Sequence, residues 1–574
     1  MDTTQWLLFI LLVQVIHFLG TWKLYVKAGR KAWEAAVPVY NAIVLMQIIN
    51  RPKWWVILLF IPIINLLMFP VIWVETIRSF GRTSLLETWL VILSLGFYIY
   101  YVNYALDVTH IKERSLHPRS VAGEWVSSIV FAIVAATLVH TYFIQPYVIP
   151  TGSLERTLRI GDLLFVSKFH YGARTPMTTI AAPMVHDTLP VLNIPSYINK
   201  PQLPYFRLPG FKDIKRKEIV VFSWPADTVR QFFRKEQGVE KPIDKKSNYV
   251  KRCVGLPGDS LQVIDGYVFV NGKQLELPDR AKPQFDYNIH ASKGVSSKLL
   301  AEIGVNDFTR KYIVSALNQQ QADALNDYAK GYNRRQDGKI EIYTAGPGIP
   351  VDVIRRNGIS LKEETGRVRM APLTDDMAAQ LKSNANIDSV VRIITPKGTR
   401  GINIFPQSPD YPWSHDQFGP IYIPEEGKTV ALNLNTLPFY KKILEKYEGN
   451  SIKVTGNQIS LNGEVVDSYT FKQDYYWMMG DNRDHSEDSR AWGYVPANHI
   501  VGTPIFIWMS VDNFMNAKGT ATNAPWKWKP RWDRIFTTVN GTGEPVSYFK
   551  YFLIALAGWF AFDFFRKRKK QKKS

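Results

Sequence analysis

The sequence predicts a mainly β protein, in which a large strand-rich region with an α/β insertion lies between transmembrane helices at both ends. Three observations lead to this prediction. Long apolar runs lie near both termini. Short runs rich in Val, Ile, Tyr and Phe, separated by Gly, Asn and Pro, follow one another through the centre of the chain. From about residue 285 to 400, stretches of helical character interrupt these runs.

Several of the apolar runs approach the roughly 20 residues that a bilayer-spanning helix needs. One of them holds Pro62 and Pro70, which predict a kink or a break. A shorter run over 33–49 holds Pro38, and we interpret it as an interfacial or re-entrant segment. The five predicted spans cover residues 4–22, 54–77, 85–106, 125–144 and 548–565.

The basic residues indicate how these spans are oriented. The chain has 70 Lys and Arg against 50 Asp and Glu, and much of the excess flanks apolar runs, which is typical of membrane proteins and argues against nucleic-acid binding. The tail after Phe565 and the loop 112–119 are basic, so we expect both in the cytoplasm. Residues 147–546 and the N-terminus are then extracytoplasmic. The loop with Arg78 and Arg82 fits this topology poorly, because it would lie outside.

The apolar runs and strand patterns predict a division of the chain. Within the central region, "DGYVFVNGKQL" and "GNQISLNGEVV" each carry an Asn-Gly that predicts a hairpin turn. "SSKLLAEIG" and "NQQQADALNDYA" look helical. The predicted regions are a multi-span membrane region (1–124), a transmembrane helix (125–146), an extracytoplasmic catalytic domain (147–546, insertion-rich over 273–470) and a C-terminal transmembrane helix with a basic tail (547–574).

One serine follows the fourth apolar run, in "VIPTGSLERTLRIGD". A serine hydroxyl attacks a carbonyl only if a neighbouring base takes its proton, and the nearest histidines, His140 and His170, lie in an apolar helix and a strand-like run. Ser153 is therefore either a turn serine or a nucleophile whose base comes from elsewhere. Lys251, in the strand-like run "NYVKRCVGL", can be that base if burial lowers its pKa.

Other kinds of chemistry have little support in the sequence. The single cysteine, Cys253, excludes an intrachain disulfide, and the scattered histidines lack the spacing of metal-ligand motifs. We therefore predict neither a metal nor another cofactor.

Four stretches carry a resemblance to a known family. "IPTGSLERTL", "GDLLFVSKFHYG", "YVKRCVGLPGD" and "GDNRDHSEDSRAWGYVP" occur in this order after an apolar run. Over residues 148–172, 249–272 and 475–508 they resemble the boxes of bacterial type I signal peptidase. The resemblance implies an all-β catalytic domain with an apolar surface resting on the membrane. It also implies a membrane-bound serine endopeptidase that removes signal peptides from exported preproteins.

The same resemblance implies roles for single residues. Ser153 would be the acylating nucleophile and Lys251 the general base. Thr151 would form the oxyanion hole together with the Ser153 N–H, and Ser486 would hydrogen-bond Lys251. Leu154 stands where the family commonly has Met, near the pocket for small substrate residues. The residues implied to form an ion-pair scaffold beneath the site are Arg252, Asp481, Asp488 and Arg490.

The sequence departs from the family pattern at several positions. Arg156 stands where the family commonly has Pro. His485 replaces a frequent Asn, which leaves a histidine base open as an alternative to Lys251. Against that alternative, His485 and Ser486 are adjacent, and adjacent side chains of an extended segment point to opposite faces.

The implied partners are preprotein signal peptides and the lipid bilayer, with the secretion translocon as a further candidate partner. The implied localisation is the bacterial inner (cytoplasmic) membrane, with several spans, a periplasmic catalytic domain and a cytoplasmic C-terminus. A non-catalytic membrane assembly or chaperone protein built on such a domain is the alternative function, and the Ser153/Lys251 pair argues against it. A self-cleaving serine–lysine regulator is a third possibility, which the membrane spans disfavour.

Overall fold

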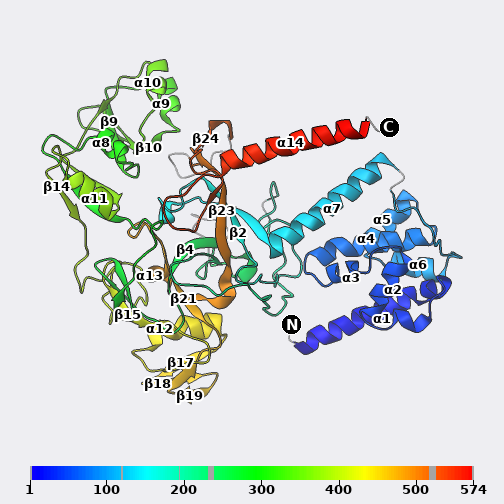
Figure 1. Ribbon diagram of the computed structural model, residues 1–574. Helices are drawn as coiled ribbons and strands as arrows, with labels where there is room; N and C mark the ends of the chain where they lie inside the picture. Colours follow the sequence, from blue (N-terminus) through cyan, green and yellow to red (C-terminus); the bar gives the residue numbers. More distant parts are fainter. Residues whose placement is uncertain (1–2, 118–119, 193, 230–237, 516–524, 572–574) are drawn as a thin grey trace. The chain divides into compact units, whose positions relative to one another are not determined.

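The computed structural model describes residues 3–117, 120–192, 194–229, 238–515 and 525–571, which form two compact units (Figure 1). The first unit comprises Met1–Gln145, Lys168–Phe211 and Asp227–Ser247. The second comprises Pro146–Ser167, Lys212–Ala226 and Asn248–Ser574. Two segments after the Ser153 motif therefore belong to the first unit, although the sequence suggested one continuous catalytic region.

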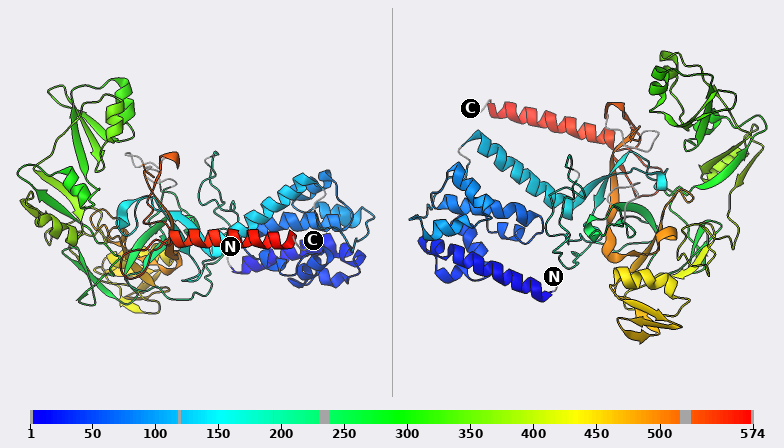
Figure 2. Two further views of the ribbon diagram at one scale, coloured as in Figure 1. Left: turned by 45° about the horizontal axis from the view of Figure 1, so that its top comes forward. Right: turned by 180° about the vertical axis from the view of Figure 1, so that it is seen from behind.

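The N-terminal part of the first unit is helical (Figure 2). α1 (Thr3–Lys27) packs against α6 (Tyr98–Tyr104) at Gly20, where a Cβ would lie 2.7 Å from the Tyr100 ring. The Tyr100 hydroxyl donates to the carbonyl of Ile16 at 2.6 Å. The remaining helices are α2 (Tyr40–Ile48), α3 (Trp55–Leu58), α4 (Ile64–Ser79), α5 (Leu85–Leu93) and α7 (Val121–Tyr142).

The helices differ from the predicted spans. Among the described residues, two helices are long and apolar enough to cross a membrane, Thr4–Lys27 and Val121–Tyr142. The run over 54–77 is divided between the short α3 and the 16-residue α4, with Pro62 in the break. The run over 85–106 forms α5 and α6, which are bent by 117° relative to each other.

The two ends of the bent pair lie side by side. The N–H of Ile111 donates to the carbonyl of Ser79 at 2.9 Å, and the rings of Phe80 and His110 are 5.4 Å apart. The segment over 85–106 thus starts and finishes at the same place. A bent pair of this kind is either a broken span or a re-entrant loop, so the crossing of the membrane by the run over 85–106 stays a prediction.

Ion pairs join further loops to the point where the two ends of the bent pair meet. Glu75, near the end of α4, is buried and accepts from Arg51 at 2.9 Å and from Arg114 at 2.5 Å. Lys27, at the end of α1, lies 3.8 Å from Asp107. We call this gathering of loops the basic face. Its Lys and Arg residues are Lys27, Arg51, Arg78, Arg82, Lys112 and Arg114.

A later part of the first unit forms an arm over residues 174–207, held by isolated bridges such as Thr178 with Gln202. Asp244 anchors the arm by accepting from the N–H and the hydroxyl of Thr178 at 3.0 and 2.8 Å. Many apolar side chains of the arm and its flank are exposed. They are Ile180, Met184, Val191, Leu192, Ile194, Ile198, Tyr205, Phe206, Leu208 and Phe211.

The second unit is built on a mostly antiparallel sheet, in which the long strand β23 pairs with several other strands (Figure 1). Its strands, in spatial order, are β1 (Ile144–Val148), β2 (Asp162–Ser167), β23 (Ile500–Asp512), β3 (Ile219–Ser223), β4 (Asn248–Gly255), β21 (Tyr475–Met479) and β22 (Val495–Pro496), with β24 (Lys529–Pro530) and β25 (Thr537–Thr538) also paired to β23.

Both predicted hairpins are confirmed. Asn271 and Gly272 have positive φ between β6 (Tyr267–Val270) and β7 (Lys273–Gln274), as a tight hairpin turn requires. Asn462 and Gly463 also have positive φ, between β18 (Gln458–Leu461) and β19 (Glu464–Val466). These two strands form a sheet with β17 (Ile452–Thr455). β5 (Ser260–Ile264) and β15 (Phe418–Tyr422) complete the sheet of β6 and β7, and β16 (Thr429–Ala431), β20 (Ser468–Thr470) and α12 (Leu437–Lys442) lie nearby in the chain.

The insertion contains two α/β lobes, each with its own apolar core, so the predicted mixed character is confirmed. The first lobe consists of β8 (Phe285–His290), β13 (Val368–Leu373), β14 (Ser389–Arg392), α8 (Ser297–Glu302) and α11 (Asp375–Lys382). The second consists of β9 (Thr309–Val314), β10 (Ala329–Arg334), β11 (Ile340–Ala345), β12 (Lys362–Glu363), α9 (Gln319–Leu325) and α10 (Val351–Arg356).

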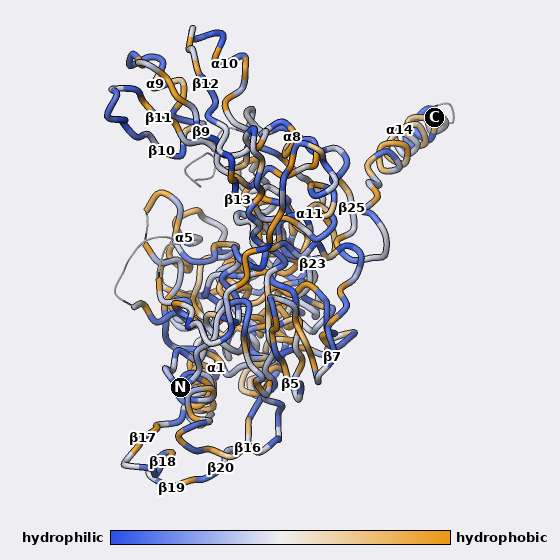
Figure 3. Tube along the Cα trace, turned by 90° about the vertical axis from the view of Figure 1, so that its left-hand side faces the viewer, coloured by the Kyte–Doolittle hydropathy of each residue, from blue (hydrophilic) through white to orange (hydrophobic). Residues whose placement is uncertain are grey.

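The chain ends in α14 (Phe549–Gln571), a 23-residue helix that is largely hydrophobic over its first part (Figure 3). Its large apolar side chains are exposed, among them Trp559, Phe560 and Phe562. Lys550 and Asp563 interrupt the apolar run, and the helix ends in the basic stretch 566–571, so α14 as a whole is more polar than α1 and α7.

Candidate active site

Ser153 lies in a short 3₁₀ turn, Gly152–Leu154, that connects β1 to β2. Thr151, the residue before the turn, has an extended backbone, and the 3₁₀ turn begins at the next residue. Ser153 is 8% exposed. The turn therefore presents its hydroxyl at the edge of a packed site, close to β4.

Lys251 approaches the serine from β4. Its Nζ donates to the Oγ of Ser153 at 2.7 Å, although the two residues are 98 positions apart in the chain. β4 is fixed on both sides, since Lys251 pairs with Val220 of β3 and the next residue pairs with Met479 of β21. The position of the amine is therefore determined by the central strands of the sheet.

The surroundings of Lys251 favour its neutral form. The side chain is buried, with its Nζ 5.1 Å from the centre of the Tyr249 ring. Burial lowers the pKa of Lys251 from its usual 10.5 to about 8, although the charges of Asp488, Glu487 and Asp481 raise it in part. A substantial fraction of the amine is thus unprotonated in mildly alkaline solution, and an unprotonated amine can accept a proton.

Two buried ion pairs lie beside this pair of residues. Arg252 donates to both carboxylate oxygens of Asp481, at 2.8 and 2.6 Å. Arg490 does the same to Asp488, at 2.9 and 2.8 Å. Thr157, four residues after Ser153, donates its hydroxyl to Asp481 at 2.7 Å, so the first ion pair also holds the chain that follows the turn.

Three further hydrogen bonds hold the carbonyl groups of the serine turn. The side chain of Asn482 donates to the carbonyl of Gly152 and its backbone N–H to that of Ser153, both at 3.1 Å. Gln284 donates its side-chain amide to the carbonyl of Glu155 at 2.8 Å. The backbone N–H of Gln284 donates to the carbonyl of Asp481, and its carbonyl accepts from the N–H of Arg483, each at 2.9 Å.

Sequence reasoning missed both of these anchoring residues. Asn482 lies inside the box "GDNRDHSEDSRAWGYVP", so an amide between Asp481 and Arg483 was a signal that could have been used. Gln284 stands at the root of the insertion, just before β8, and the sequence around it has no feature that marks it. Its role depends on a parallel bridge to Asn482 that only the folded chain forms.

Ser486 lies beside the turn but does not make the expected bond. Its Oγ is buried and has no hydrogen-bond partner within the described residues, so the predicted hydrogen bond to Lys251 is absent. A Cβ at Gly480 would lie 2.2 Å from this Oγ and 2.5 Å from the carbonyl oxygen of Ser153. Only glycine allows the backbone at 480 to pass so close to both groups.

Two other predicted site residues differ in their exposure. Leu154 is 1% exposed and packs in the core with Ile149 and Leu158, and its contact with substrate stays a prediction. Thr151 is exposed, and its hydroxyl makes no hydrogen bond to any part of the chain that the structure describes.

His485 points to a different partner. Its Nε2 lies 2.9 Å from a carboxylate oxygen of Asp286, in the first lobe of the insertion, and this bond raises the pKa of His485. The hydrogen bond to the hydroxyl of Ser153 comes from Lys251 instead. The geometry thus favours lysine over histidine as the partner of the serine.

Two family models match the chain. One, described as signal peptidase, peptidase S26, matches residues 122–322 and 423–509, just over half of the chain. These ranges include the serine turn, β4 and the box around Asp481, and they leave out residues 323–422, about half of the insertion. The other, DUF5684, is described as a family of unknown function and matches residues 33–113, which hold the bent pair α5–α6.

Curated proteins also resemble the chain. A signal peptidase I from Haemophilus influenzae is 20% identical over 439 residues, which cover 75% of this chain and 79% of the relative. A signal peptidase I from Helicobacter pylori (strain J99) is 24% identical over 425 residues, which cover 73% of this chain and 91% of the relative. One from Rickettsia massiliae is 28% identical over 153 residues, 27% of this chain and 44% of that relative.

Proposed function

The chain belongs to the peptidase S26 family of signal peptidases, and from that premise we propose that it cleaves signal peptides from exported preproteins with Ser153 as nucleophile and Lys251 as general base. The observation that carries this proposal is the 2.7 Å hydrogen bond between the Lys251 amine and the Ser153 hydroxyl in a buried site. A base within hydrogen-bonding distance is what a serine nucleophile needs.

The proposed reaction has two stages. In the first, neutral Lys251 takes the proton of Ser153 as the serine oxygen attacks the carbonyl carbon of the scissile peptide bond. The ammonium then gives this proton to the departing amine, which leaves the signal peptide as an ester on Ser153. In the second, Lys251 takes a proton from water, and the resulting attack on the ester releases the signal peptide and restores the hydroxyl.

Other residues support these steps in the proposal. The exposed hydroxyl of Thr151 and the N–H of Ser153 are the proposed donors to the oxyanion. The ion pairs Arg252–Asp481 and Arg490–Asp488 keep β4 and the 481–490 loop in place. Ser486 is proposed to accept or donate a hydrogen bond only when substrate or water is bound, since its buried Oγ has no partner within the described residues.

We also propose a topology in which α1 and α7 cross the membrane and the basic face is cytoplasmic. The re-entrant pair α5–α6 starts and ends at that face, so the loops with Arg82 and Arg114 lie on one side of the membrane. Lys and Arg then gather on the cytoplasmic side, as in most membrane proteins. The N-terminus and the Ser153 site are extracytoplasmic, and α14 returns the basic tail to the cytoplasm. This arrangement removes the difficulty that the loop with Arg78 and Arg82 posed.

The proposed location of the site agrees with its substrate. Ser153 lies 11 residues after the end of α7, and an extended chain rises by no more than about 3.5 Å per residue. The serine therefore stays within about 40 Å of the end of that helix. A signal peptide held in the bilayer presents its cleavage site close to the membrane surface, with small residues before the cleaved bond.

The test is cleavage of a preprotein by the purified full-length enzyme. We expect Ser153→Ala and Lys251→Met to lose cleavage while they remain folded and inserted in the membrane, because each removes one of two groups that cannot replace each other. Lys273→Met, an exposed lysine of β7, is the matched control and should cleave like the wild type. Near-normal turnover by either site variant would refute the assignment of the two roles.

A further inference from the structure

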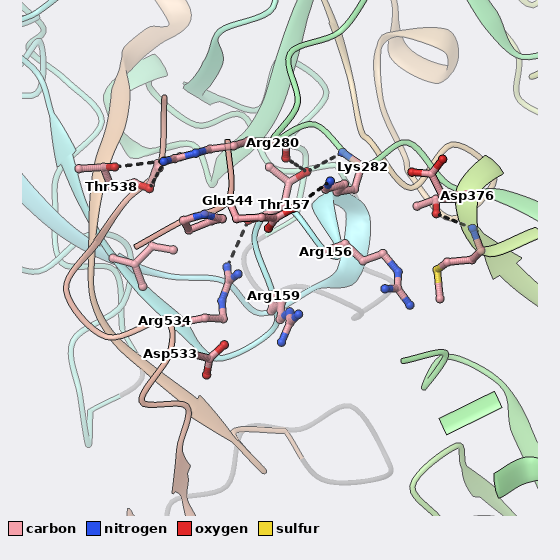
Figure 4. A pocket seen from close by; sticks show the side chains of 15 residues that line it. Arg156, Thr157, Arg159, Arg280, Lys282, Asp376, Asp533, Arg534, Thr538 and Glu544 are labelled. Atoms are coloured by element: carbon pink, nitrogen blue, oxygen red, sulfur yellow. Dashed lines mark hydrogen bonds and ion pairs between the residues drawn. The ribbon is translucent and has the colours of Figure 1, made fainter. Parts of the chain in front are cut away.

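A polar cavity of about 390 Å³ lies beside the chain that follows the serine turn (Figure 4). Neither Ser153 nor Lys251 lines it. Its lining comes from the chain just after the turn, from the start of the insertion, from the beginning of α11, from β23 and from the segment before α14. Cavities of this size accommodate small ligands or lipid headgroups.

The lining carries more positive than negative charge. Its cationic side chains are Arg156, Arg159, Arg280, Lys282 and Arg534, and its carboxylates are Asp376, Asp533 and Glu544. Figure 4 draws Arg156, Arg159 and Arg534 along one side of the opening and Arg280 and Lys282 along the other.

Most of the carboxylates do not neutralise this charge. Asp376 and Asp533 are exposed, and Glu544 lies 3.4 Å from Lys282, with its side chain 82% exposed. Arg534 is paired with Asp162, which is outside the lining, at 2.5 Å. Arg280 is bound to backbone carbonyls, such as that of Thr538 at 2.9 Å, so it has no carboxylate partner within the described residues.

Arg159 is the least satisfied of these cations. Its guanidinium makes no hydrogen bond or ion pair with any residue that the structure describes, although it is only partly exposed. Burial lowers the pKa of Arg159, and the neighbouring charges of Arg534 and Arg531 lower it further, against the opposing effects of Glu155 and Asp162. A cation that its surroundings repel is a place where an anion is stabilised.

Arg156 faces the same cavity at a conformational cost. Its φ is 70°, in the left-handed region that L residues other than Asn and Asp rarely adopt. One of its terminal nitrogens donates to the carbonyl of Gly304 at 2.6 Å, while its Nε is buried without a partner within the described residues. Such strain persists only when other interactions compensate for it, and a ligand that Arg156 binds would do so.

We propose that this cavity binds a phosphate-bearing anion, held mainly by Arg159 and Arg156. A guanidinium offers paired N–H donors that match the oxygens of a phosphate, and a tetrahedral dianion can accept from several guanidinium groups at once. The site is separate from the serine and goes beyond the proposed peptidase reaction.

The phosphate group has two sources, a lipid headgroup or a free phosphate. The position of the cavity in the chain favours the lipid source, because the lining residues Glu544 and Pro545 precede the start of α14 at Phe549 by only a few residues. If α14 enters the bilayer, the cavity lies within about 20 Å of the membrane surface along the chain.

The experiment measures the melting temperature of the full-length protein with two probes. The first is inorganic phosphate, added to protein in an uncharged detergent and compared with sodium chloride at equal ionic strength. The second is a set of nanodiscs of phosphatidylcholine alone or of an equimolar mixture with phosphatidylglycerol. The variants are Arg159→Gln, which removes the charge, and Arg159→Lys, which keeps it. Arg355→Gln, an exposed arginine of α10, is the matched control.

We expect at least one probe to raise the melting temperature of the wild type in a saturable way, and Arg159→Gln to weaken that response at least about tenfold in apparent affinity. Arg159→Lys should keep part of the response and Arg355→Gln all of it. A response to phosphate shows that the free anion suffices, and a response to phosphatidylglycerol nanodiscs alone identifies the headgroup. Equal responses of the wild type and Arg159→Gln to both probes would overturn the proposal. Because melting is measured, this result does not depend on the peptidase assignment.

Discussion

Replacing Lys251 by methionine should make the protein inactive and, at neutral pH, more stable. The fold lowers the pKa of this lysine from 10.5 to about 8, because burial disfavours the ammonium. One pKa unit corresponds to about 1.4 kcal/mol. At any pH at which the lysine is protonated in both the folded and the unfolded protein, it therefore lowers the free energy of unfolding by about 3 kcal/mol. Methionine has a similar length and no charge. It loses the hydrogen bond to Ser153, worth about 1 kcal/mol, which leaves a net gain of about 2 kcal/mol.

The sign of this effect depends on pH. Below pH 8 the lysine is protonated in both the folded and the unfolded state, and its cost is fully present. Between the folded value near 8 and the unfolded value near 10.5, the unfolded chain binds more protons, so the stability of the wild type rises with pH relative to the variant. The advantage of Lys251→Met should therefore be largest near pH 7 and shrink towards pH 10.

The assay compares melting temperatures of the wild type, Lys251→Met and the exposed control Lys273→Met in the same detergent at both pH values. We expect Lys251→Met to melt a few degrees above the wild type near pH 7 and the control to melt with the wild type. A Lys251→Met variant that melts clearly lower at neutral pH would mean that Lys251 is a charged structural partner, and the reasoning from its burial would be refuted.

Four further predictions follow from the contacts of the site and of the membrane region. Gln284→Ala should lower kcat about tenfold with little change in KM, because it frees the serine turn without touching substrate; an unchanged kcat would show that the turn needs no such anchor. Gly480→Ala should abolish cleavage, since its Cβ would lie 2.2 Å from a neighbouring hydroxyl oxygen, and an active variant would contradict the packing. His485→Asn should keep most activity in the same assay, whereas a loss of about a hundredfold or more would favour a histidine base. The native cysteine is buried and does not compete for label, so Thr83→Cys and Asp107→Cys can each be probed with an impermeant maleimide in intact spheroplasts. Both should be protected, because the loops that hold them lie on the same side of the membrane. Labelling of one and protection of the other would mean that α5–α6 crosses the membrane.

The sequence predicts some parts of the fold well for local reasons. An Asn-Gly turn is decided by two residues, so the hairpins at Asn271 and Asn462 follow from the sequence directly. The α/β character of the insertion also follows from local patterns, such as the capped helix α9 that begins after Asn318.

The membrane region was harder to predict because an apolar run does not reveal its path. The run over 85–106 has the length and composition of a span, yet it is bent, and bonds between distant loops bring its ends together. A pair such as Ile111 with Ser79 depends on tertiary contact, which no hydropathy pattern contains.

The candidate site shows the same division. Ser153 and Lys251 could be selected from motifs, since each lies in a distinctive box. Gln284 could not, because its contribution is a contact across 129 residues with the carbonyl of Glu155. The missing bond of Ser486 and the burial of Leu154 could not be predicted from the sequence either, because both depend on how the turn packs.

Whether Lys251 is the base for Ser153 is decided by the pH dependence of kcat/KM for preprotein cleavage. If it is, kcat/KM rises with pH through an apparent pKa of about 8, the value to which burial lowers the pKa of Lys251. The same limb should persist in His485→Asn, and Lys251→Met should show no measurable rate. A limb near the usual histidine value of about 6.5 that disappears in His485→Asn, or an active Lys251→Met enzyme that keeps the limb, would contradict the claim.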